Sequence, residues 1–447
     1  MIETELARRW IESVVDAPIE RLEPMPGGGS RAMSILDLRS AGPRARLVVR
    51  TETGGGPFAG TELGSLEREA DVYRALEGSG LPVPVLIGVA PDGRSLIATR
   101  LAGSNDYTGI ADPEEKSAVR RDYLDRLAAL HALDPERLDL PRLQRPGGAG
   151  GQARAWLQVW SGLFGARVKR PAPVLRFAIA WLDEHAPPDA ERTVVCHGDV
   201  GPGNFVHEGG HVTGLLDWEL CHLGDFHDDL GMLALRAHQL NGFGDLTEDL
   251  EYYEKVSGQR IDAGRVRYFR AVALVLGLTT SIMQLDGRGE GRVQVPLYLH
   301  LVPTLELLLI RALADLLGFD VAEPDTPQPL VDPVGRDVAG AIREALTDVA
   351  AAGDVVRTAG ALDLVAHLDA AARIGPAVDA LDLDEVEAVI GRRPATYLQA
   401  VAEVDASIAS GSVDPEAFLL WAFRSARRRV ALWPAWAPVM ETPLLPL

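Results

Sequence analysis

Residues 193–219 read TVVCHGDVGPGNFVHEGGHVTGLLDWE, and the prediction of the fold starts from this stretch. The apolar run at 193–196 predicts a strand, and the loop after it carries Asp199 and, five residues later, Asn204. Two further short strands are expected to fold back on each other through Glu208-Gly209-Gly210, because paired glycines are typical of a tight hairpin turn. The stretch therefore predicts a strand, a loop and a β-hairpin.

The predicted hairpin brings oxygen-bearing side chains to one of its ends. Counted outward from the turn, Asn204 lies opposite residues near Leu215, and Asp217 follows two positions later. Because a strand advances about 3.3 Å per residue, Asn204 and Asp217 are expected within reach of one divalent ion. Mg²⁺ prefers oxygen ligands and takes few of them from protein. Phosphoryl transfer also needs a carboxylate that accepts the proton of the substrate hydroxyl, and Asp199 is the candidate.

This segment resembles the catalytic loop and metal-binding aspartate of the aminoglycoside phosphotransferase and choline kinase family. The resemblance rests on His197-Gly198-Asp199, Asn204, Leu216-Asp217-Trp218-Glu219, Gly224-Asp225 and Asp229-Leu230. Within that family the chain is most similar to the kinase-like domains fused to acyl-CoA dehydrogenases. The resemblance implies an α+β, two-lobed protein-kinase-like fold, with a β-rich N-terminal lobe and a helical C-terminal lobe, and it implies ATP and Mg²⁺ as cofactors.

The family pattern also implies a role for each matching residue. Asp199 would be the general base, and His197 would orient the catalytic loop by hydrogen bonding. Asn204 and Asp217 would hold the metal. The two acids that follow the hairpin would brace the loop from the next helix rather than contact substrate.

The resemblance continues upstream with weaker motifs. The Gly-rich run at 26–30 is the candidate phosphate-covering loop, with Gly28, Gly29 and Ser30 as nucleotide-binding residues, although such a run is equally typical of a plain turn. Arg50 stands where the family normally has a lysine on the third strand, and Glu69 on the following helix is its expected partner. An arginine can grip phosphate or carboxylate with two nitrogens but does not replace lysine in every respect. The alternative for Arg50 is a surface ion pair at a strand end.

Residues 84–89 and 95–101 predict two more strands, joined at Pro91-Asp92-Gly93. By the family pattern, the backbone at Thr99 and Leu101 would meet the adenine edge. Beyond residue 103 the periodicity becomes helical, and helices are expected near 113–133, 152–164, 173–185, 226–241, 246–257, 262–286 and 296–318.

These patterns divide the chain into four parts. Residues 1–103 form the predicted nucleotide-binding lobe, and 104–322 form the helical lobe with the catalytic loop and the substrate site. A Pro- and Asp-rich linker is expected at 323–335. The Ala-rich remainder, 336–447, predicts a separate all-α domain and is a candidate surface for self-association or a partner.

Composition limits the classes of function. The 447 residues carry a net charge of −20, which argues against nucleic acid as a partner and disfavours an anionic membrane surface. Charged residues interrupt the most apolar stretch, 296–317, so a buried helix is expected there rather than a membrane span. With only two cysteines, Cys196 and Cys221, and no apolar leader at the N-terminus, we expect a cytoplasmic protein.

The function predicted from these residues is transfer of the ATP γ-phosphoryl group to a hydroxyl of a small molecule. Kinship with the dehydrogenase-fused group suggests a hydroxyacyl-type acceptor, and an aminoglycoside-like acceptor stays open. One alternative is a pseudokinase that regulates a partner through its C-terminal helices, which the arginine at position 50 favours. A second is a metal-dependent hydrolase built from the histidines near the hairpin, although no pair of them has the spacing of a zincin helix.

Overall fold

The computed structural model describes residues 5–15, 17–25, 31–39, 46–54, 58–239, 243–286, 295–319, 321, 323–324, 340–342, 347, 355–442 and 444–447. The chain forms two compact units. The first contains Met1–Gln158, Ala186–Arg270 and Leu447, and the second contains Val159–His185 and Ala271–Pro446. The predicted catalytic and nucleotide-binding residues all belong to the first unit.

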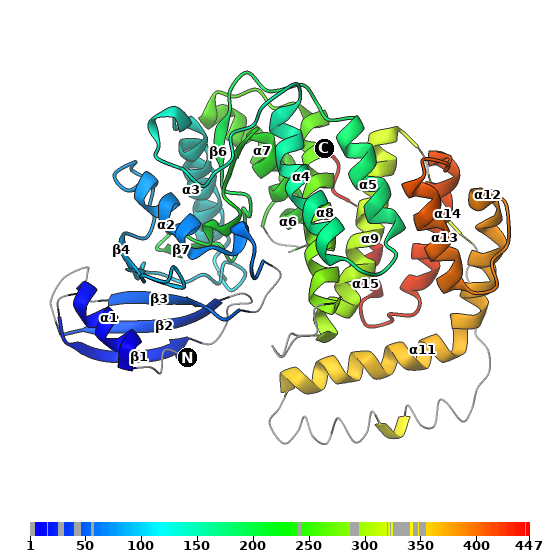
Figure 1. Ribbon diagram of the computed structural model, residues 1–447, viewed down its shortest axis with the longest axis horizontal. Helices are drawn as coiled ribbons and strands as arrows, with labels where there is room; N and C mark the ends of the chain where they lie inside the picture. Colours follow the sequence, from blue (N-terminus) through cyan, green and yellow to red (C-terminus); the bar gives the residue numbers. More distant parts are fainter. Residues whose placement is uncertain are drawn as a thin grey trace. The chain divides into compact units, whose positions relative to one another are not determined.

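The first unit begins with a five-stranded antiparallel sheet in the order β1-β2-β3-β5-β4 (Figure 1). The strands are β1 (Ile19–Met25), β2 (Arg31–Leu38), β3 (Arg46–Glu52), β4 (Leu86–Val89) and β5 (Ser95–Thr99). Helix α1 (Glu5–Val15) covers one face, where Ile11 packs with Leu36, Leu47 and Val49 in an apolar core. Because side chains alternate along a strand, Arg50 of β3 lies on the opposite face from Val49. The sheet thus keeps one face apolar and presents Arg50 on the other.

Helix α2 (Leu66–Leu76) follows β3 in sequence and contacts β4 and β5. Its buried residues include Glu69 and Tyr73, which are one helical turn apart and therefore share a face. A short 3₁₀ turn, Glu62–Gly64, precedes the helix. Glu69 is therefore a fully buried acid that needs a partner.

The second part of this unit contains the predicted hairpin. Strands β7 (Phe205–Glu208) and β8 (His211–Leu215) pair through a two-residue turn in which Gly209 and Gly210 have φ of 58° and 81°. These positive angles are those of the twisted turns that hairpins favour. Strand β6 (Val194–Cys196) pairs with β9 (His222–Gly224), a three-residue strand that the sequence did not predict.

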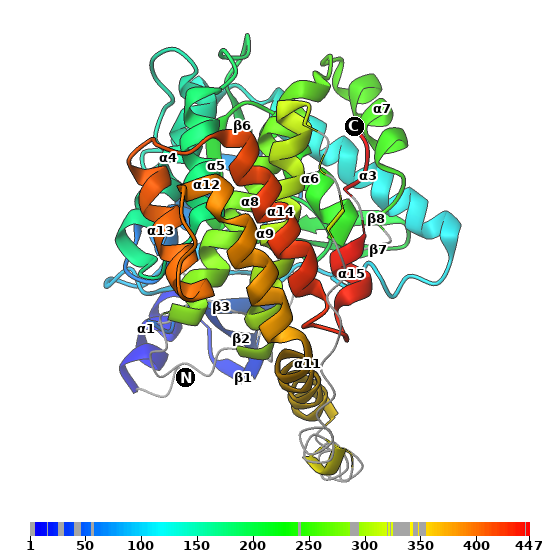
Figure 2. The same cartoon turned by 90° about the vertical axis from the view of Figure 1, so that its right-hand side faces the viewer.

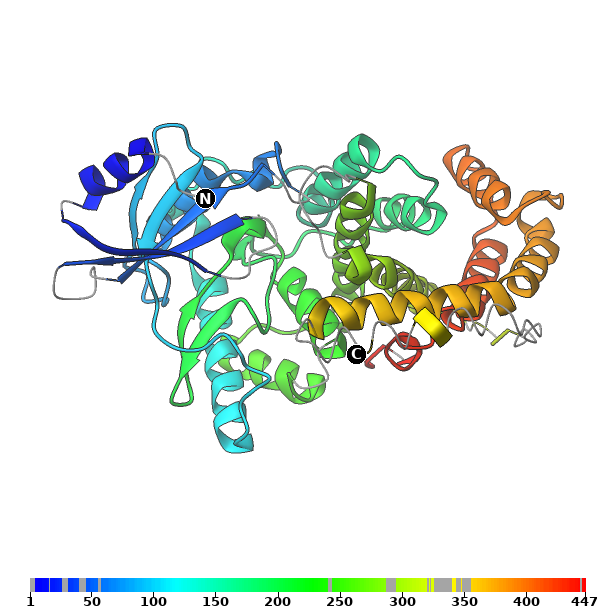
Figure 3. The same ribbon diagram turned by 90° about the horizontal axis from the view of Figure 1, so that it is seen from below.

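Three helices of the first unit accompany these strands, and Figure 3 shows the hairpin beside α3. They are α3 (Pro113–Ala132), α6 (His227–Gln239) and α7 (Leu246–Ser257), and each begins within one residue of its predicted start. An aromatic cluster of Tyr107, Tyr123, Phe205 and Phe243 joins α3 to the hairpin, with Tyr123 and Phe205 at a ring distance of 4.7 Å. This core fixes the strand that follows Asn204.

The second unit is built of helices (Figure 2). The chain enters it through α4 (Gly151–Arg167) and α8 (Ala263–Asp286), and it contains α5 (Pro173–Glu184), α9 (Val295–Leu317), α11 (Val355–Glu385), α12 (Glu387–Ile390), α13 (Tyr397–Ala409), α14 (Pro415–Val430) and α15 (Ala437–Glu441). Among the described residues, α8 is long and apolar enough to cross a membrane, and 83% of its apolar window is buried inside the protein. Such burial is typical of a core helix.

The C-terminal helices pack on α5 and α9 within the second unit. Arg176 of α5 donates to both carboxylate oxygens of Asp405 on α13, at 2.9 and 3.0 Å. The compact unit that holds residues 355–442 therefore also includes α5 and α9, whereas the sequence predicted a separate domain from 336 onward. The two units likewise do not divide at residue 103. Most of the predicted linker at 323–335 lies outside the described residues.

Candidate active site

The loop between β6 and β7 carries Asp199 and Asn204, as predicted. The Nδ2 of Asn204 donates a 2.7 Å hydrogen bond to the backbone oxygen of Asp199, and the backbone nitrogen of Asn204 donates to the oxygen of Gly201. Both side chains are half-buried. The amide of Asn204 therefore anchors the backbone of Asp199 and leaves its own Oδ1 directed elsewhere.

Asp217 comes directly after the hairpin and has an unusual backbone. Phe205 pairs with Leu215, and the nitrogen of Leu216 donates to the oxygen of Asn204 at 2.8 Å. The predicted register is thus correct to one residue, and Asn204 and Asp217 leave the same end of the hairpin. Asp217 has φ 62° and ψ 66°, the only left-handed conformation of a non-glycine among the described residues. Such strain persists where the surroundings impose it, often at functional sites.

His197 connects the catalytic loop to the strand that leads to Asp217. Its Nδ1 accepts from the backbone nitrogen of Asp199 at 3.3 Å, and its Nε2 donates to the oxygen of Leu216 at 2.9 Å. With both ring nitrogens used in this way, the imidazole has no lone pair left for a substrate proton. His197 therefore has the contacts of an orienting residue and not those of a proton acceptor.

Asp229, on the first turn of α6, braces the catalytic loop. Its two carboxylate oxygens accept from the backbone nitrogens of His197 and Gly198, at 2.7 and 2.8 Å, and Oδ2 also accepts from His131. Burial alone would raise the pKa of Asp229, but the hydrogen bond and charge of His131 outweigh burial and lower the pKa. The carboxylate thus stays ionised and holds the loop backbone.

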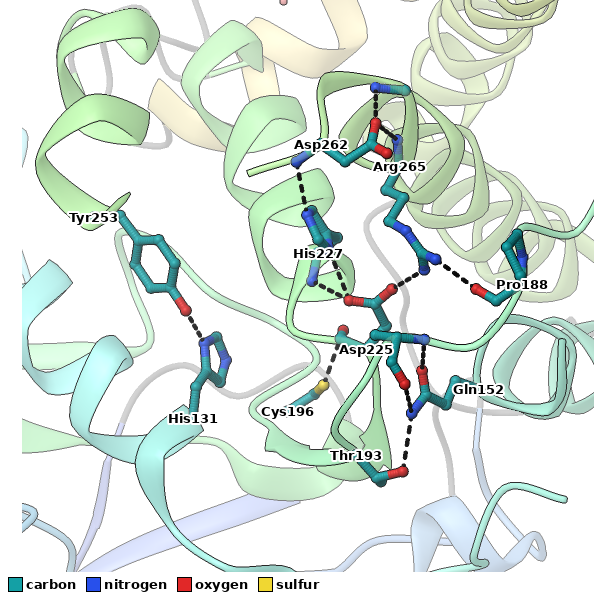
Figure 4. A network of polar contacts seen from close by, with 12 residues as sticks. His131, Gln152, Pro188, Thr193, Cys196, Asp225, His227, Tyr253, Asp262 and Arg265 are labelled. Carbon is teal, nitrogen blue, oxygen red and sulfur yellow. Dashed lines mark hydrogen bonds and ion pairs between the residues drawn. The ribbon is translucent and has the colours of Figure 1, made fainter. Parts of the chain in front are cut away.

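Asp225 anchors the start of the same helix to α8 (Figure 4). Oδ1 accepts from the backbone nitrogen and the Nδ1 of His227, and Oδ2 accepts from Arg265 at 2.6 Å. The Nε2 of His227 in turn accepts from the nitrogen of Asp262. These contacts hold the start of α6, so Asp229 binds the catalytic loop directly and Asp225 anchors the helix that carries Asp229.

Arg50 joins the N-terminal sheet to the loop after the hairpin. Its Nη1 donates to Oε1 of Glu69, the partner predicted from the sequence, and its Nη2 donates to Oδ1 of Asp217 at 3.1 Å. Tyr73 also donates to Oε1 of Glu69, at 2.6 Å. Burial would lower the pKa of Arg50, but the charges of Glu69 and Asp217 prevail and raise that pKa well above its usual value. Arg50 is therefore a permanent cation beside the predicted metal ligand, not a surface ion pair.

The donor set at the end of the hairpin suits Mg²⁺. Within the described part of the chain, no hydrogen bond reaches Oδ2 of Asp217 or Oδ1 of Asn204, and the Asp217 side chain is 37% exposed. A carboxylate oxygen and an amide oxygen that accept no hydrogen bond in the described contacts match a hard cation that completes its shell with water and phosphate. Oδ1 of Asp217, by contrast, is already in contact with Arg50.

The remaining predicted nucleotide-binding residues belong to the Gly-rich run and to the end of β5. Gly28, Gly29 and Ser30 lie outside the described residues. Thr99 ends β5, where its Oγ1 accepts from the nitrogen of Val85 at 2.9 Å. Leu101 follows as a half-buried residue whose side chain fills the space above Gly214, on the hairpin. The 99–101 segment thus touches the hairpin that bears the site.

Two charged residues near the site were not predicted as site residues. Arg236, in the last turn of α6, donates from Nη2 to Oδ1 of Asp199. Glu219 lies two residues beyond Asp217 and 3.5 Å from Arg31, and burial together with the charge of Asp217 raises the pKa of Glu219 to about 7. Arg236 lies seven residues after Asp229, so two turns of helix bring both residues to the same face of α6, but this spacing alone does not show that the face meets Asp199.

The histidines near the hairpin do not gather into one site. His207 is buried at the end of β7, His222 stacks on Trp156 at 4.1 Å, and His227 pairs with Asp225. Across the described ranges, no group of three or more His, Cys, Asp and Glu side chains could hold a metal ion. The hydrolase alternative therefore gains no support from the arrangement of these residues.

Comparison with known proteins places this geometry in a family. The sequence profile of the phosphotransferase enzyme family matches residues 23–269, more than half of the chain, so the chain belongs to that family. The family and its phosphotransferase class are thus confirmed as predicted.

Curated relatives match over shorter stretches. Acyl-CoA dehydrogenase family member 10 of Mus musculus is 27% identical over 190 residues, which cover 40% of this chain and 17% of that protein. Acyl-CoA dehydrogenase family member 11 of Rattus norvegicus is 27% identical over 181 residues, or 38% of this chain and 23% of that protein. The chain therefore spans less than a quarter of the length of either. Aminoglycoside 3′-phosphotransferase of Streptomyces fradiae is 28% identical over 218 residues, covering 46% of this chain and 77% of that protein.

A solved structure shares the fold. A candidate aminoglycoside phosphotransferase of Ralstonia eutropha JMP134 superposes with a TM-score of 0.53 at 21% identity, over 67% of this chain and 95% of that one. This likeness confirms the protein-kinase-like fold predicted from the hairpin motif.

Proposed function

We propose that the chain is an ATP-dependent phosphotransferase that moves the γ-phosphoryl group to a hydroxyl of a small molecule. The observation that carries the proposal is the convergence of Asp199, Asn204 and Asp217 at one end of the β7–β8 hairpin, with Arg50 in contact with Asp217. Phosphoryl transfer needs a proton acceptor, metal-holding oxygens and a cation close together, and little other chemistry from the protein.

Each residue has a separate task in this proposal. Asp199 accepts the proton of the acceptor hydroxyl while the acceptor oxygen bonds to the γ-phosphorus and the bond to the bridging oxygen of ADP breaks. Asn204 and Asp217 would hold Mg²⁺, which supplies positive charge against the phosphate oxygens. Arg50, as a guanidinium with several donors, offers further charge toward the phosphates. His197 and Asp229 keep the loop in place.

The relatives suggest which class of hydroxyl compound accepts the phosphoryl group. The match to an aminoglycoside 3′-phosphotransferase supports an aminoglycoside-like polyol. The match to acyl-CoA dehydrogenase family members 10 and 11 supports a hydroxyacyl-type acceptor. We favour the hydroxyacyl class, because two of the curated relatives are acyl-CoA dehydrogenase family members.

A specific contact favours the alternative of a pseudokinase. The guanidinium of Arg50 already occupies Oδ1 of Asp217, an oxygen that a metal site would use. In that alternative the chain would bind nucleotide weakly or not at all, and its C-terminal helices would bind a partner or a second copy. The intact set of three catalytic oxygens speaks against it, because a domain without catalysis has no chemical need for all three.

Thermal unfolding with and without Mg²⁺-ATP distinguishes an active phosphotransferase from a pseudokinase. A ligand present at about 100 times its dissociation constant adds about 2.7 kcal/mol to the free energy of unfolding. We therefore expect millimolar Mg²⁺-ATP to raise the melting temperature, and ADP release to appear when hydroxylated metabolites, acyl-CoA derivatives and aminoglycosides are screened. An unchanged melting temperature at millimolar nucleotide would rule out the enzyme.

A further inference from the structure

The carboxylate of Asp199 is held on one side only. Nη2 of Arg236 donates to Oδ1 of Asp199, and the side chains are 30% and 21% exposed. Among the described residues, no hydrogen bond reaches the other oxygen, Oδ2. The two oxygens of the proposed base therefore differ, since one is fixed by a guanidinium and the other is open to a substrate.

The catalytic loop is shaped around the stem of Arg236. A Cβ atom at Gly201 would lie 3.1 Å from Cγ and 3.2 Å from Cβ of Arg236, and Gly201 has φ 128°, which side chains rarely allow. The nitrogen of Gly201 donates to the hydroxyl of Tyr123 at 2.9 Å, which holds the loop in this position. The close approach shows that the loop and the arginine pack as one piece.

Helix α6 contacts the loop at two points. Asp229 binds the backbone nitrogens of His197 and Gly198, and Arg236 binds the side chain of Asp199. These two residues of α6 are seven positions apart and so share a face of the helix. One rigid element thus sets both the backbone of the loop and the direction of its carboxylate.

The charge of Arg236 matches this position. The carboxylate of Asp199 raises the pKa of Arg236, with a smaller contribution from Asp217. A guanidinium stays charged at any physiological pH, so Arg236 can fix Asp199 without taking its proton. In the described contacts Arg236 donates one hydrogen bond, from Nη2 to Oδ1 of Asp199.

We propose that Arg236 is a positioning residue for phosphoryl transfer, which holds Asp199 by Oδ1 so that Oδ2 faces the acceptor hydroxyl. This inference rests on the proposed function. In the transfer step the hydroxyl proton moves to Oδ2 of Asp199, the acceptor oxygen bonds to the γ-phosphorus, and ADP leaves with the electrons of the broken bond. Arg236 exchanges no proton, and it acts only by restricting the rotation of the base.

Steady-state ATP hydrolysis, with water as the acceptor, tests the role without knowledge of the natural substrate. Misplacement of a reacting group by about 1 Å can cost roughly 100-fold in rate. We expect Arg236→Met to lower kcat for ADP release by about 10- to 100-fold while the dissociation constant for Mg²⁺-ATP stays close to that of the wild type. Arg236→Lys, which keeps the charge, should recover part of kcat.

Arg120→Met is the matched control for a merely structural effect. Arg120 of α3 pairs with the buried Asp249 at 3.1 Å, and none of its described polar contacts involves the catalytic loop. This variant also loses an ion pair in the first unit, so it should lower the melting temperature but leave kcat unchanged. If both variants lose kcat in proportion to their loss of melting temperature, Arg236 is only structural and the inference is wrong.

A double-mutant comparison shows whether Arg236 acts through Asp199. Residues that act as a unit have non-additive effects on rate. In an Asp199→Asn background, Arg236→Met should therefore lower the residual rate no further. An equal fold-loss in both backgrounds would mean that Arg236 acts independently of the base, and it would overturn the inference.

The outcomes also separate this inference from the proposed function. If the wild type shows neither stabilisation by Mg²⁺-ATP nor ADP release, the proposed function fails and the inference fails with it. If the wild type is active and Arg236→Met retains its kcat, the inference alone fails.

Discussion

Arg50 and Asp217, which are 167 positions apart in sequence, meet through a 3.1 Å hydrogen bond from Nη2 to Oδ1. The same guanidinium binds the fully buried Glu69. Arg50 therefore links the N-terminal sheet, helix α2 and Asp217, the proposed metal ligand. Because a buried acid depends on this link, the contact bears on stability as well as on nucleotide binding.

Arg50→Met should both destabilise the protein and weaken nucleotide binding. Of the partners of Glu69 in the described part of the chain, this change leaves the hydroxyl of Tyr73, and breaking a buried pair costs about 3–5 kcal/mol. Urea denaturation would measure the loss, and titration with Mg²⁺-ATP should show at least about tenfold weaker binding, or roughly 1.4 kcal/mol. The stability and nucleotide affinity of Arg50→Lys should fall between those of the wild type and Arg50→Met, because an ammonium cannot bind two carboxylates in the same way. Unchanged stability in Arg50→Met would contradict the role of the pair.

Asp217→Asn should separate metal binding from folding. Asparagine tolerates the left-handed backbone of this position, so the loop should keep its shape. It lacks the negative charge that holds Mg²⁺, and even changes outside a metal's direct ligands cost about 10- to 100-fold in metal affinity. Calorimetric titration should therefore show Mg²⁺-dependent nucleotide binding lowered by at least that factor, with metal-free ATP binding little affected. If nucleotide binding depends equally on Mg²⁺ in the wild type and in Asp217→Asn, Asp217 is not a metal ligand.

Asp199→Asn should lower turnover strongly but leave a measurable residual rate, with nucleotide affinity nearly intact. A positioned general base contributes about 100- to 10,000-fold to a rate. The side chain of Asn keeps the shape of Asp and can still meet Arg236, so the loop should persist. ADP release in a coupled assay and Mg²⁺-ATP affinity from titration would be compared with the wild type. A variant with full turnover would show that another group accepts the proton.

The sequence was sufficient for those parts of the site that are local in the chain. Asn204 and Asp217 were placed together correctly because hairpin register depends on the turn between them. The pair of Arg50 and Glu69 was also expected, since a strand and the helix that follows it are neighbours. The two hydrogen bonds of His197 are local as well, because its partners Asp199 and Leu216 lie in the same stretch of sequence.

Contacts between distant elements could not be predicted in this way. The approach of Arg236 to Asp199 depends on how α6 packs against the loop, and the contact of Arg50 with Asp217 depends on how the sheet meets the hairpin. Strand β9 has three residues, too few to show a period. The association of α13 with α5, through Asp405 and Arg176, joins segments 229 positions apart, so the sequence suggested a separate domain instead.

The pH dependence of stability should reveal a buried acid outside the site. Asp249 of α7 is 1% exposed, and burial raises its pKa from 3.8 to about 7 despite the nearby charge of Arg120. Between about pH 4 and pH 7 the folded protein then binds more protons than the unfolded chain, so the free energy of unfolding falls as pH rises. The contribution is on the order of 2–4 kcal/mol.

Asp249→Asn should therefore have a higher free energy of unfolding than the wild type at pH 7.5, which is about 0.5 units above the raised pKa. Toward pH 4 the free energies of unfolding of the two proteins should converge, because Asp249 is then protonated in the wild type. Urea denaturation at several pH values would measure this difference. Glu251→Gln is the matched control, because Glu251 is exposed on the same helix and its neutralisation should leave the pH profile unchanged. If Asp249→Asn keeps the slope of the wild type across this range, the acid is already ionised in the folded protein, and its pairing with Arg120 outweighs the cost of its burial.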